Sequence, residues 1–364
     1  MADKKELLRF CGSLEQAAGV RRIEYQDGRA SGLRCALVQN GPLEFLLMLD
    51  KCLDPAWIRY KGLNMSFLSK PGLQGRNPYD TAGREAVRSI MGGAMFTCGL
   101  DHVHGYRTVD GVEYPTHGRI RTTPAEKIGM DSFFDGDQYR IRVTGEMRQA
   151  EIFGENMILR RTVETVYGSN EILFHDEIEN QGFKPEPLCF LYHCNAGYPF
   201  LTPESRLILP EVSCIPRDGE AQKGMAGRLS MGQAEDGQAE DGQAEQVFQY
   251  SLASDREGNT FGAFVNDDRE LALCIRWNVK KIPFMAQWKS CASGDYAMAL
   301  EPANCGFDGR AGRTRLLAPF EKHINEIRFC IAEGSREIEA LEEECRNLIS
   351  EQDYGTDGGI SCMM

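Results

Sequence analysis

The sequence lacks a long apolar segment, and it has no excess of positive charge. No stretch approaches the roughly 18 consecutive apolar residues that a membrane-spanning helix needs. The N-terminus, Met1-Ala-Asp-Lys-Lys-Glu, has no apolar stretch behind its charged residues, so no export signal is expected. The formal net charge is −13, which repels phosphate backbones and anionic lipid. We therefore expect neither nucleic acid nor a membrane as a partner.

Motifs that hold nucleotides, flavins or metals are also absent. The chain contains no Walker loop, dinucleotide glycine fingerprint, Gly-x-Ser-x-Gly elbow or His-Glu-x-x-His motif. Its 13 cysteines are odd in number, and none form a Cys-x-x-Cys pair. Several lie in apolar, strand-like runs, where a thiol behaves as a small hydrophobic group. This pattern is typical of a reducing compartment, so we predict a cytoplasmic protein without cofactor or metal.

Short apolar runs separated by Gly, Asn, Asp and Pro dominate the chain from about residue 30 onwards. Alternation is clearest at Tyr139-x-Ile-x-Val, and the runs 157–166 and 171–179 predict a hairpin across Gly168-Ser-Asn170. About thirteen such runs without helical patterns between them predict stacked antiparallel sheets, an all-β fold. Because no Gly/Ser/Pro-rich linker divides the chain, we predict a single domain over residues 1–364, with its core at about 30–332.

Three segments lie outside this strand pattern. Residues 3–19 predict a short N-terminal helix, and residues 335–352 predict a C-terminal helix that packs on the sheets. Residues 232–245 repeat the unit Gln-Ala-Glu-Asp-Gly almost three times. This acidic low-complexity segment has too little apolar surface to offset the entropy of ordering. We expect it to be a solvated loop between strands, with no role in catalysis.

The run Leu188-Cys-Phe-Leu-Tyr-His-Cys-Asn-Ala-Gly197 reads as a buried strand with polar residues in its middle. Because side chains alternate along a strand, His193 and Asn195 share one face with Cys189 and Leu191. A polar group that is buried without a partner costs about 2–7 kcal/mol, so such groups need partners. Either the core satisfies His193, or this face lines a cavity. The pattern alone leaves both possibilities open.

A second strand-like run, Tyr296-Ala-Met-Ala-Leu-Glu-Pro, carries Glu301 on the same face as two alanines. That arrangement favours a carboxylate with space beside it, although an exposed glutamate at a sheet edge is the alternative. Upstream, Trp288 stands next to Lys289. Tryptophan can stack on the apolar face of a sugar ring, and lysine can hold a carboxylate ionised. A core tryptophan and a solvated lysine remain the alternative.

Several polar residues cluster earlier in the chain. The pair His102-x-His104 could ligate a metal, but no third ligand stands at a recognisable spacing. We favour a cleft rim formed by Asp101, His102, His117 and Arg119, which would offer donors and acceptors to a polyhydroxylated ligand.

Three of these motifs together, His117-Gly-Arg119, Leu-Tyr-His193-Cys-Asn and Leu-Glu301-Pro, resemble those of the aldose 1-epimerase (galactose mutarotase-like) family. Residues 93–101, 188–201, 287–289 and 299–305 resemble a functionally unassigned branch of that superfamily, and the likeness spans residues 30–332. It implies a large antiparallel β-supersandwich, with His193 as general acid and Glu301 as general base. The chain has His193-Cys194-Asn195 where the family has an aromatic residue and a phenylalanine after the histidine.

The resemblance implies that the protein interconverts the α and β anomers of a small sugar by acid–base catalysis. Two alternatives remain: isomerisation or β-elimination of a keto- or oxidised sugar, with Lys289 as electrophile, and carbohydrate sensing without turnover. A homo-oligomer is also possible. The residues expected to bind the sugar are His117, Arg119, Asp101, His102, Asn195, Trp288 and Lys289.

Overall fold

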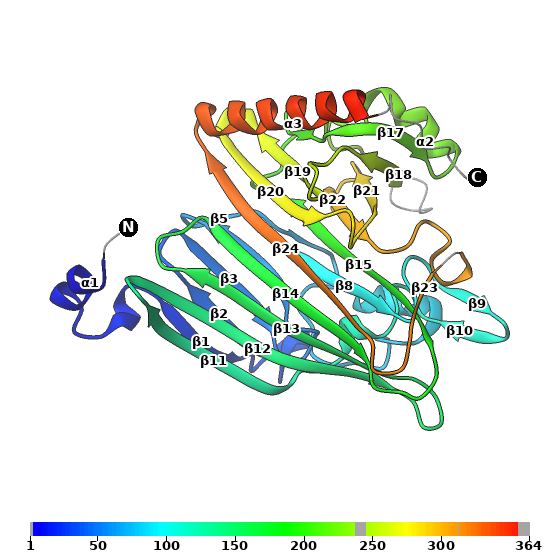
Figure 1. Cartoon of the computed structure of the whole chain (residues 1–364), viewed down its shortest axis with the longest axis horizontal. Coiled ribbons are helices and arrows are strands. Elements are labelled where there is room, and N and C mark those ends of the chain that lie inside the picture. Colours follow the sequence, from blue (N-terminus) through cyan, green and yellow to red (C-terminus); the bar gives the residue numbers. More distant parts are fainter. Residues whose placement is uncertain (1–2, 237–244, 313, 356–364) are drawn as a thin grey trace.

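The computed structural model of the protein describes residues 3–236, 245–312 and 314–355 (Figure 1). Its two largest sheets contain eight and seven strands, and the strands within each pair antiparallel. This arrangement confirms the all-β prediction. Among the described residues, no helix is both long enough and apolar enough to cross a membrane.

The eight-stranded sheet contains the predicted hairpin, formed by β13 and β14. Residues along its long strands alternate between buried and less buried, as expected for a sheet that packs one face on the core. In spatial order its strands are β11 (Glu126–Asp135), β12 (Gln138–Ala150), β13 (Asn156–Val166), β14 (Glu171–Asn180), β24 (Lys322–Glu333), β20 (Leu271–Asn278), β19 (Asn259–Asn266) and β16 (Arg206–Ile208).

In the seven-stranded sheet, β15 (Glu186–Gly197) pairs with β22 (Ala297–Ala303) on one side and with β8 (Met95–Leu100) and β23 (Arg315–Leu317) on the other. The side chains of Phe190 and Tyr192 lie in the core between the sheets, whereas those of Cys189 and Leu191 belong to a small cluster on the opposite face. The predicted alternation is therefore confirmed. The other strands are β17 (Glu211–Pro216), β18 (Glu245–Leu252) and β21 (Phe284–Ser290).

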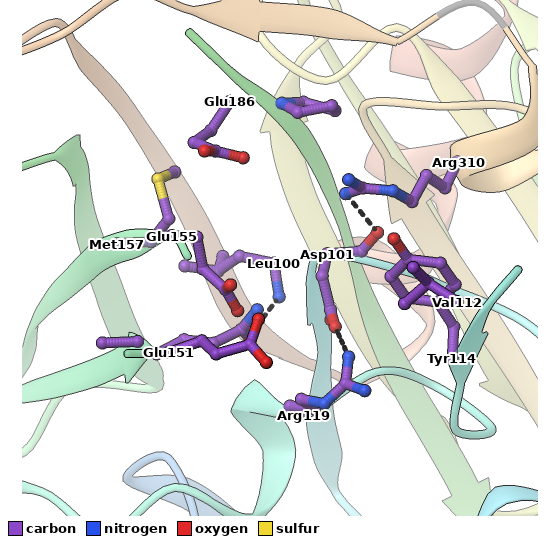
Figure 2. Close-up of a pocket in the computed structure, with 13 residues that line it drawn as sticks. Leu100, Asp101, Val112, Tyr114, Arg119, Glu151, Glu155, Met157, Glu186 and Arg310 are labelled. Carbon is purple, nitrogen blue, oxygen red and sulfur yellow. Dashed lines mark hydrogen bonds and ion pairs between the residues drawn. The ribbon is translucent and has the colours of Figure 1, made fainter. Parts of the chain in front are cut away.

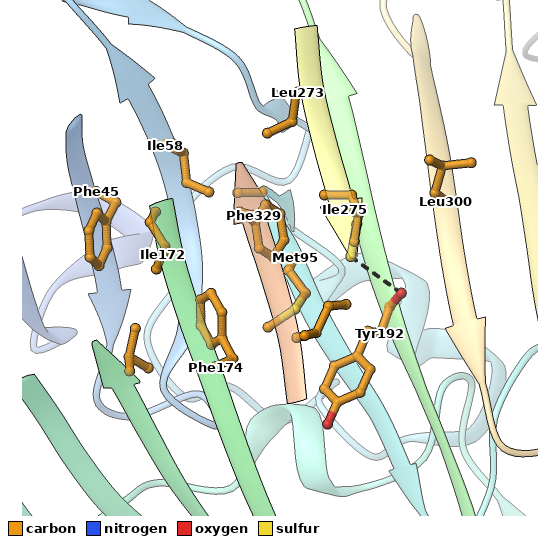
Figure 3. Packing of buried hydrophobic residues seen from close by; sticks show 14 of the residues in the cluster. Phe45, Ile58, Met95, Ile172, Phe174, Tyr192, Leu273, Ile275, Leu300 and Phe329 are labelled. Atoms are coloured by element: carbon orange, nitrogen blue, oxygen red, sulfur yellow. Dashed lines mark hydrogen bonds between the residues drawn. The ribbon is translucent and has the colours of Figure 1, made fainter. Parts of the chain in front are cut away.

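A five-stranded N-terminal sheet adds a third part to the same core. Figure 3 shows Phe45 and Ile58 from this sheet near Ile172, Phe174 and Phe329 of the eight-stranded sheet. Its strands are β1 (Gly19–Glu24), β2 (Arg34–Gln39), β3 (Leu43–Met48), β4 (Asp54–Tyr60) and β5 (Leu63–Asn64). Two short ribbons pair β6 (Phe67–Leu68) with β7 (Gly92–Gly93) and β9 (Arg107–Val109) with β10 (Val112–Tyr114).

Helices are short, except at the C-terminus. Helix α3 (Ser335–Gly355) buries Ile338, Leu341, Cys345 and Leu348 against strands of the eight-stranded sheet, which confirms the predicted helix. The other α-helices are α1 (Lys4–Phe10) and α2 (Gly219–Gly224). Within the described residues, the 3₁₀ helices are η1 (Leu14–Gln16), η2 (Gly28–Ala30), η3 (Gly83–Ser89), η4 (Ile120–Thr122), η5 (Met225–Gly227), η7 (Asp267–Arg269) and η8 (Gly309–Ala311).

Two predictions about local structure need correction. The helix expected over 3–19 ends at Phe10, because Cys11 is extended and Gly12 follows it; Ser13 then caps the separate turn η1. Of the acidic repeat, residues 237–244 lie outside the described residues, whereas Glu245 begins strand β18. That end of the repeat is therefore part of a sheet rather than a solvated loop. The single domain over 1–364 stays a prediction.

An arginine without exposed side-chain surface lies between the sheets. Arg161 of β13 donates to Asp176 of β14 at 2.8 and 2.7 Å, and to Asp54 of β4 at 2.6 Å. A buried guanidinium remains charged because such carboxylates compensate it, and together they tie the N-terminal sheet to the eight-stranded sheet. Tyr192 of β15 donates to the same Asp176 carboxylate at 2.6 Å, so the network also reaches the seven-stranded sheet.

Candidate active site

A cavity of about 400 Å³ opens beside β15, β18, β21 and β22. At its wall, Nε2 of His193 lies 3.1 Å from Oε1 of Glu301. The two residues come from adjacent antiparallel strands, because the pairing of Cys194 with Leu300 brings His193 of β15 beside Glu301 of β22. The two polar residues that the strand patterns singled out thus form a direct contact.

Aromatic rings hold the imidazole of His193 in place. The ring of Phe96 stacks on it with a centroid separation of 4.4 Å, and the ring of His117 stands perpendicular to it at 5.6 Å. Trp288 approaches from another side, with a centroid separation of 5.9 Å. Burial lowers the pKa of His193 to about 3, because an imidazolium loses its hydration there.

The same surroundings shift the pKa of Glu301 in the opposite direction, upward. Burial, together with the nearby carboxylate of Glu245, raises the pKa of Glu301 to about 8, and the guanidinium of Arg217 opposes the shift. Both shifts favour the neutral form of the pair, in which the proton resides on the Glu301 carboxyl group and Nε2 of His193 lies 3.1 Å from its Oε1. Between these two pKa values, the pair as a unit carries one transferable proton.

Arg217 and Glu245 line the same cavity, and the sequence analysis did not identify either of them. Glu245 accepts a hydrogen bond from Nε1 of Trp288 at 2.8 Å and another from Arg217 at 2.8 Å. Glu245 is the last residue of the acidic repeat, and Arg217 stands in no recognisable motif. One signal in the sequence indicated Glu245. It immediately precedes the alternating apolar run 246–252, so the strand could be expected to begin one residue earlier, at Glu245.

Three other residues that the sequence predicted also line the cavity. They are Trp288, Asn195 and His117. The amide of Asn195 donates to the carbonyl groups of Gly93 at 3.0 Å and His193 at 3.1 Å, so its orientation is fixed. Burial holds the pKa of His117 well below its usual range, which makes this imidazole a neutral hydrogen-bonding group.

Four predicted residues lie elsewhere. Lys289 follows Trp288 on β21, so its side chain takes the opposite face, where Nζ donates to the carbonyl of Gly227 at 3.1 Å. Contrary to expectation, it does not stand beside Glu301. Asp101 and Arg119 form an ion pair that lines a second cavity. His102 is buried, and its Nε2 donates to the carbonyl of Gly105 at 2.7 Å.

Comparisons with known proteins agree with this architecture. The family described as Domain of unknown function (DUF4432) matches residues 30–329. A search of curated proteins finds no match. A candidate aldose 1-epimerase from Klebsiella pneumoniae subsp. pneumoniae has a solved structure with a TM-score of 0.83 and 20% sequence identity, over 91% of this chain and 87% of that one.

Two further solved structures are similar over most of their length. A galactose mutarotase-like protein from Clostridium acetobutylicum has a TM-score of 0.57 and 12% identity, over 87% of this chain and 99% of that one. A galactose 1-epimerase from Lactobacillus acidophilus has a TM-score of 0.55 and 14% identity, with the same two coverages. These similarities show the galactose mutarotase-like fold, as the sequence resemblance implied.

Proposed function

The chain belongs to the DUF4432 family and has the galactose mutarotase-like fold, and from that premise we propose that it interconverts the α and β anomers of a small sugar. The observation that carries this proposal is the 3.1 Å contact between His193 and Glu301 in a cavity of about 400 Å³. The anomeric hydroxyl oxygen and the ring oxygen of a sugar hemiacetal are bonded to the same carbon. Two neighbouring groups that share one proton can therefore take a proton from one of these oxygens and give a proton to the other.

In the proposed reaction, Glu301 takes the proton from the anomeric hydroxyl while His193 gives a proton to the ring oxygen. The bond between the anomeric carbon and the ring oxygen breaks, and a carbonyl group forms at that carbon. Rotation about the adjacent carbon–carbon bond and reversal of both proton transfers close the other anomer. The pair reaches the charged form that starts this reaction when its one proton moves from Glu301 to His193. Ring opening then leaves the neutral pair and closure restores the charged one, so the number of protons on the pair is unchanged. Each positioned proton transfer contributes about 10²–10⁴ in rate.

The other residues of the cavity suit a sugar ring. The face of Trp288 is held by its hydrogen bond to Glu245 and offers an apolar surface on which the carbon–hydrogen face of a ring can lie. His117 and Asn195 supply neutral polar atoms for hydroxyl groups. The position of Lys289 outside this cavity removes the electrophile that the isomerisation or elimination alternative required. Anomer exchange therefore has better support than those reactions.

A panel of sugars followed by proton NMR tests this function. We expect at least one aldose to bind and to show exchange between its anomeric signals faster than in buffer. New vinylic signals from an oxidised glycoside, or conversion of an aldose to a ketose, would instead indicate a lyase or an isomerase. A sugar that binds with exchange at the buffer rate would indicate a sensor.

The pH dependence of exchange should report the shared proton of the pair. Activity requires one proton, so it should fall below about pH 3 and above about pH 8, where the pair gains a second proton or loses its only one. Because the Glu245 carboxylate raises the pKa of Glu301, Glu245→Gln should move the alkaline limb to lower pH.

Glutamine at position 245 can still accept the hydrogen bond from Trp288, so the ring should keep its place. Arg217→Met provides the opposite change: loss of the guanidinium should move the alkaline limb upward. Rate-against-pH curves for the three proteins check both directions. An alkaline limb that stays in place in both variants would show that Glu301 does not set it.

A further inference from the structure

A second cavity, of about 270 Å³, lies near the tip of the β12–β13 hairpin and the start of β15. Figure 2 shows Glu151, Glu155 and Glu186 on one side, and Tyr114, Arg119 and Arg310 on the other. Its size is near the lower end of the range for small-molecule sites. Its walls thus separate carboxylates from guanidinium groups.

The three glutamates on one side of this cavity are not held in ion pairs among the described residues. In residues 3–236, 245–312 and 314–355, the carboxylates of Glu151, Glu155 and Glu186 have no ion-pair partner within 4 Å and no side-chain hydrogen bond. Glu186 is half-buried, and burial together with the charge of Glu155 raises its pKa, whereas the charges of Arg310 and Lys184 oppose the shift. Three acidic groups that face one cavity, none of them held in an ion pair, favour a cationic ligand.

The two arginines on the other side of the cavity differ in how far their donors are already hydrogen-bonded. Arg119 is paired with Asp101 and also donates to the carbonyl of Glu113 at 3.0 Å. Arg310 is half-buried over the ring of Tyr114, at 4.8 Å from its centroid. Among described residues it makes a single hydrogen bond, a 3.3 Å contact from Nη1 to the carbonyl of Asp101. Most of its donors therefore remain available to a carboxylate, which a guanidinium binds in a bidentate manner.

A buried amide independently indicates a ligand. The Gln149 side chain lines the cavity with only 5% of its residue surface exposed, and its Oε1 accepts from the Leu100 amide at 2.9 Å. Its Nε2 has no acceptor anywhere in the described chain. Buried amide donors are nearly always hydrogen-bonded, so this one calls for an acceptor from a bound molecule.

We propose that this cavity binds a basic α-amino acid, with the carboxylate of the ligand on Arg310 and Gln149 and its ammonium groups on Glu151, Glu155 and Glu186. A zwitterion matches the separation of charge between the two walls. A second cationic group is favoured because three unpaired carboxylates stand against one unpaired guanidinium. The ligand is neither a sugar nor a substrate of the His193–Glu301 pair, so this site goes beyond the proposed function.

Isothermal titration of the full-length protein with L-lysine and L-arginine tests the proposal. We expect at least one of them to bind, and norleucine, which lacks the second ammonium group of lysine, to bind at least about tenfold more weakly. Arg310→Met should weaken lysine binding about tenfold or more, while binding of cadaverine, which has no carboxylate, should change little. Glu155→Gln should weaken the binding of both lysine and cadaverine.

Matched controls come from helix α3, outside the cavity. Arg336→Met and Glu339→Gln should leave lysine binding unchanged, and the melting temperature of each variant verifies folding. Glu186→Gln replaces Glu155→Gln if the latter fails to fold. Absence of binding of both amino acids at about 10 mM would overturn the proposal, as would equal lysine affinity in Arg310→Met and wild type. Because no variant touches His193 or Glu301, failure here leaves the anomer-exchange proposal to its own tests.

Discussion

Replacement of Glu301 by glutamine should reduce the rate of anomer exchange by at least about 10². The amide keeps the size of the side chain and can still hydrogen-bond to His193, but it cannot take a proton from the anomeric hydroxyl. Polarimetry on the best-bound sugar gives the rate, and titration of the same sugar should show nearly unchanged affinity. Glu339→Gln on the exposed surface of α3 is a matched control that should keep the wild-type rate.

His193→Asn should produce a loss of similar size, because asparagine retains a polar group but cannot protonate the ring oxygen. The double variant should lose much less than the product of the two single losses. Groups that act as one unit are strongly non-additive, since removal of either already disables the shared step. Multiplicative losses would show that the two residues act independently, and a fully active Glu301→Gln would eliminate the assignment of the base.

Replacement of Arg161 by methionine should reduce the free energy of unfolding by about 3–5 kcal/mol. The side chain has no exposed surface and compensates Asp54 and Asp176, both of which are buried. Its loss leaves two carboxylates without a cation between the sheets. Denaturant unfolding followed by fluorescence measures the change in midpoint and slope.

The neighbouring arginine provides the control. Arg160 stands on the other face of β13 and pairs with Glu177 and Glu179 at the surface, with 31% of its side chain exposed. Arg160→Met should therefore cost only about 0–1 kcal/mol. Equal costs for the two variants would show that burial of Arg161 does not determine its contribution.

Alternation along strands explains which site residues could be predicted. The strand patterns single out His193 and Glu301 as polar residues within apolar strands, and the family resemblance adds their roles as acid and base. The same rule applies to Trp288 and Lys289, which are consecutive on β21 and must point to opposite faces. Placing both in one cleft ignored that rule.

The other predicted residues that lie outside this cavity are in loops, where no regular alternation of side chains indicates which way they point. His117 and Gly118 both have positive φ, at 62° and 72°, so the chain turns sharply between the cavity beside His193 and the second cavity. This turn leaves His117 in the first cavity and Arg119 in the second. Arg217 directly follows β17, and the pairing of β17 with β18 brings it to the site beside Glu245, a long-range contact that no local pattern around Arg217 indicates.

The central claim is that the His193–Glu301 pair opens and closes a sugar ring, and saturation-transfer NMR tests it most directly. One anomeric proton of a bound aldose is saturated, and the loss of signal from the other anomer is followed with wild type and with Glu301→Gln at equal concentration. We predict rapid transfer with wild type and transfer at the buffer rate with the variant. A sugar that binds in this cavity but shows equal transfer with both proteins, at any pH between about 4 and 8, would contradict the account.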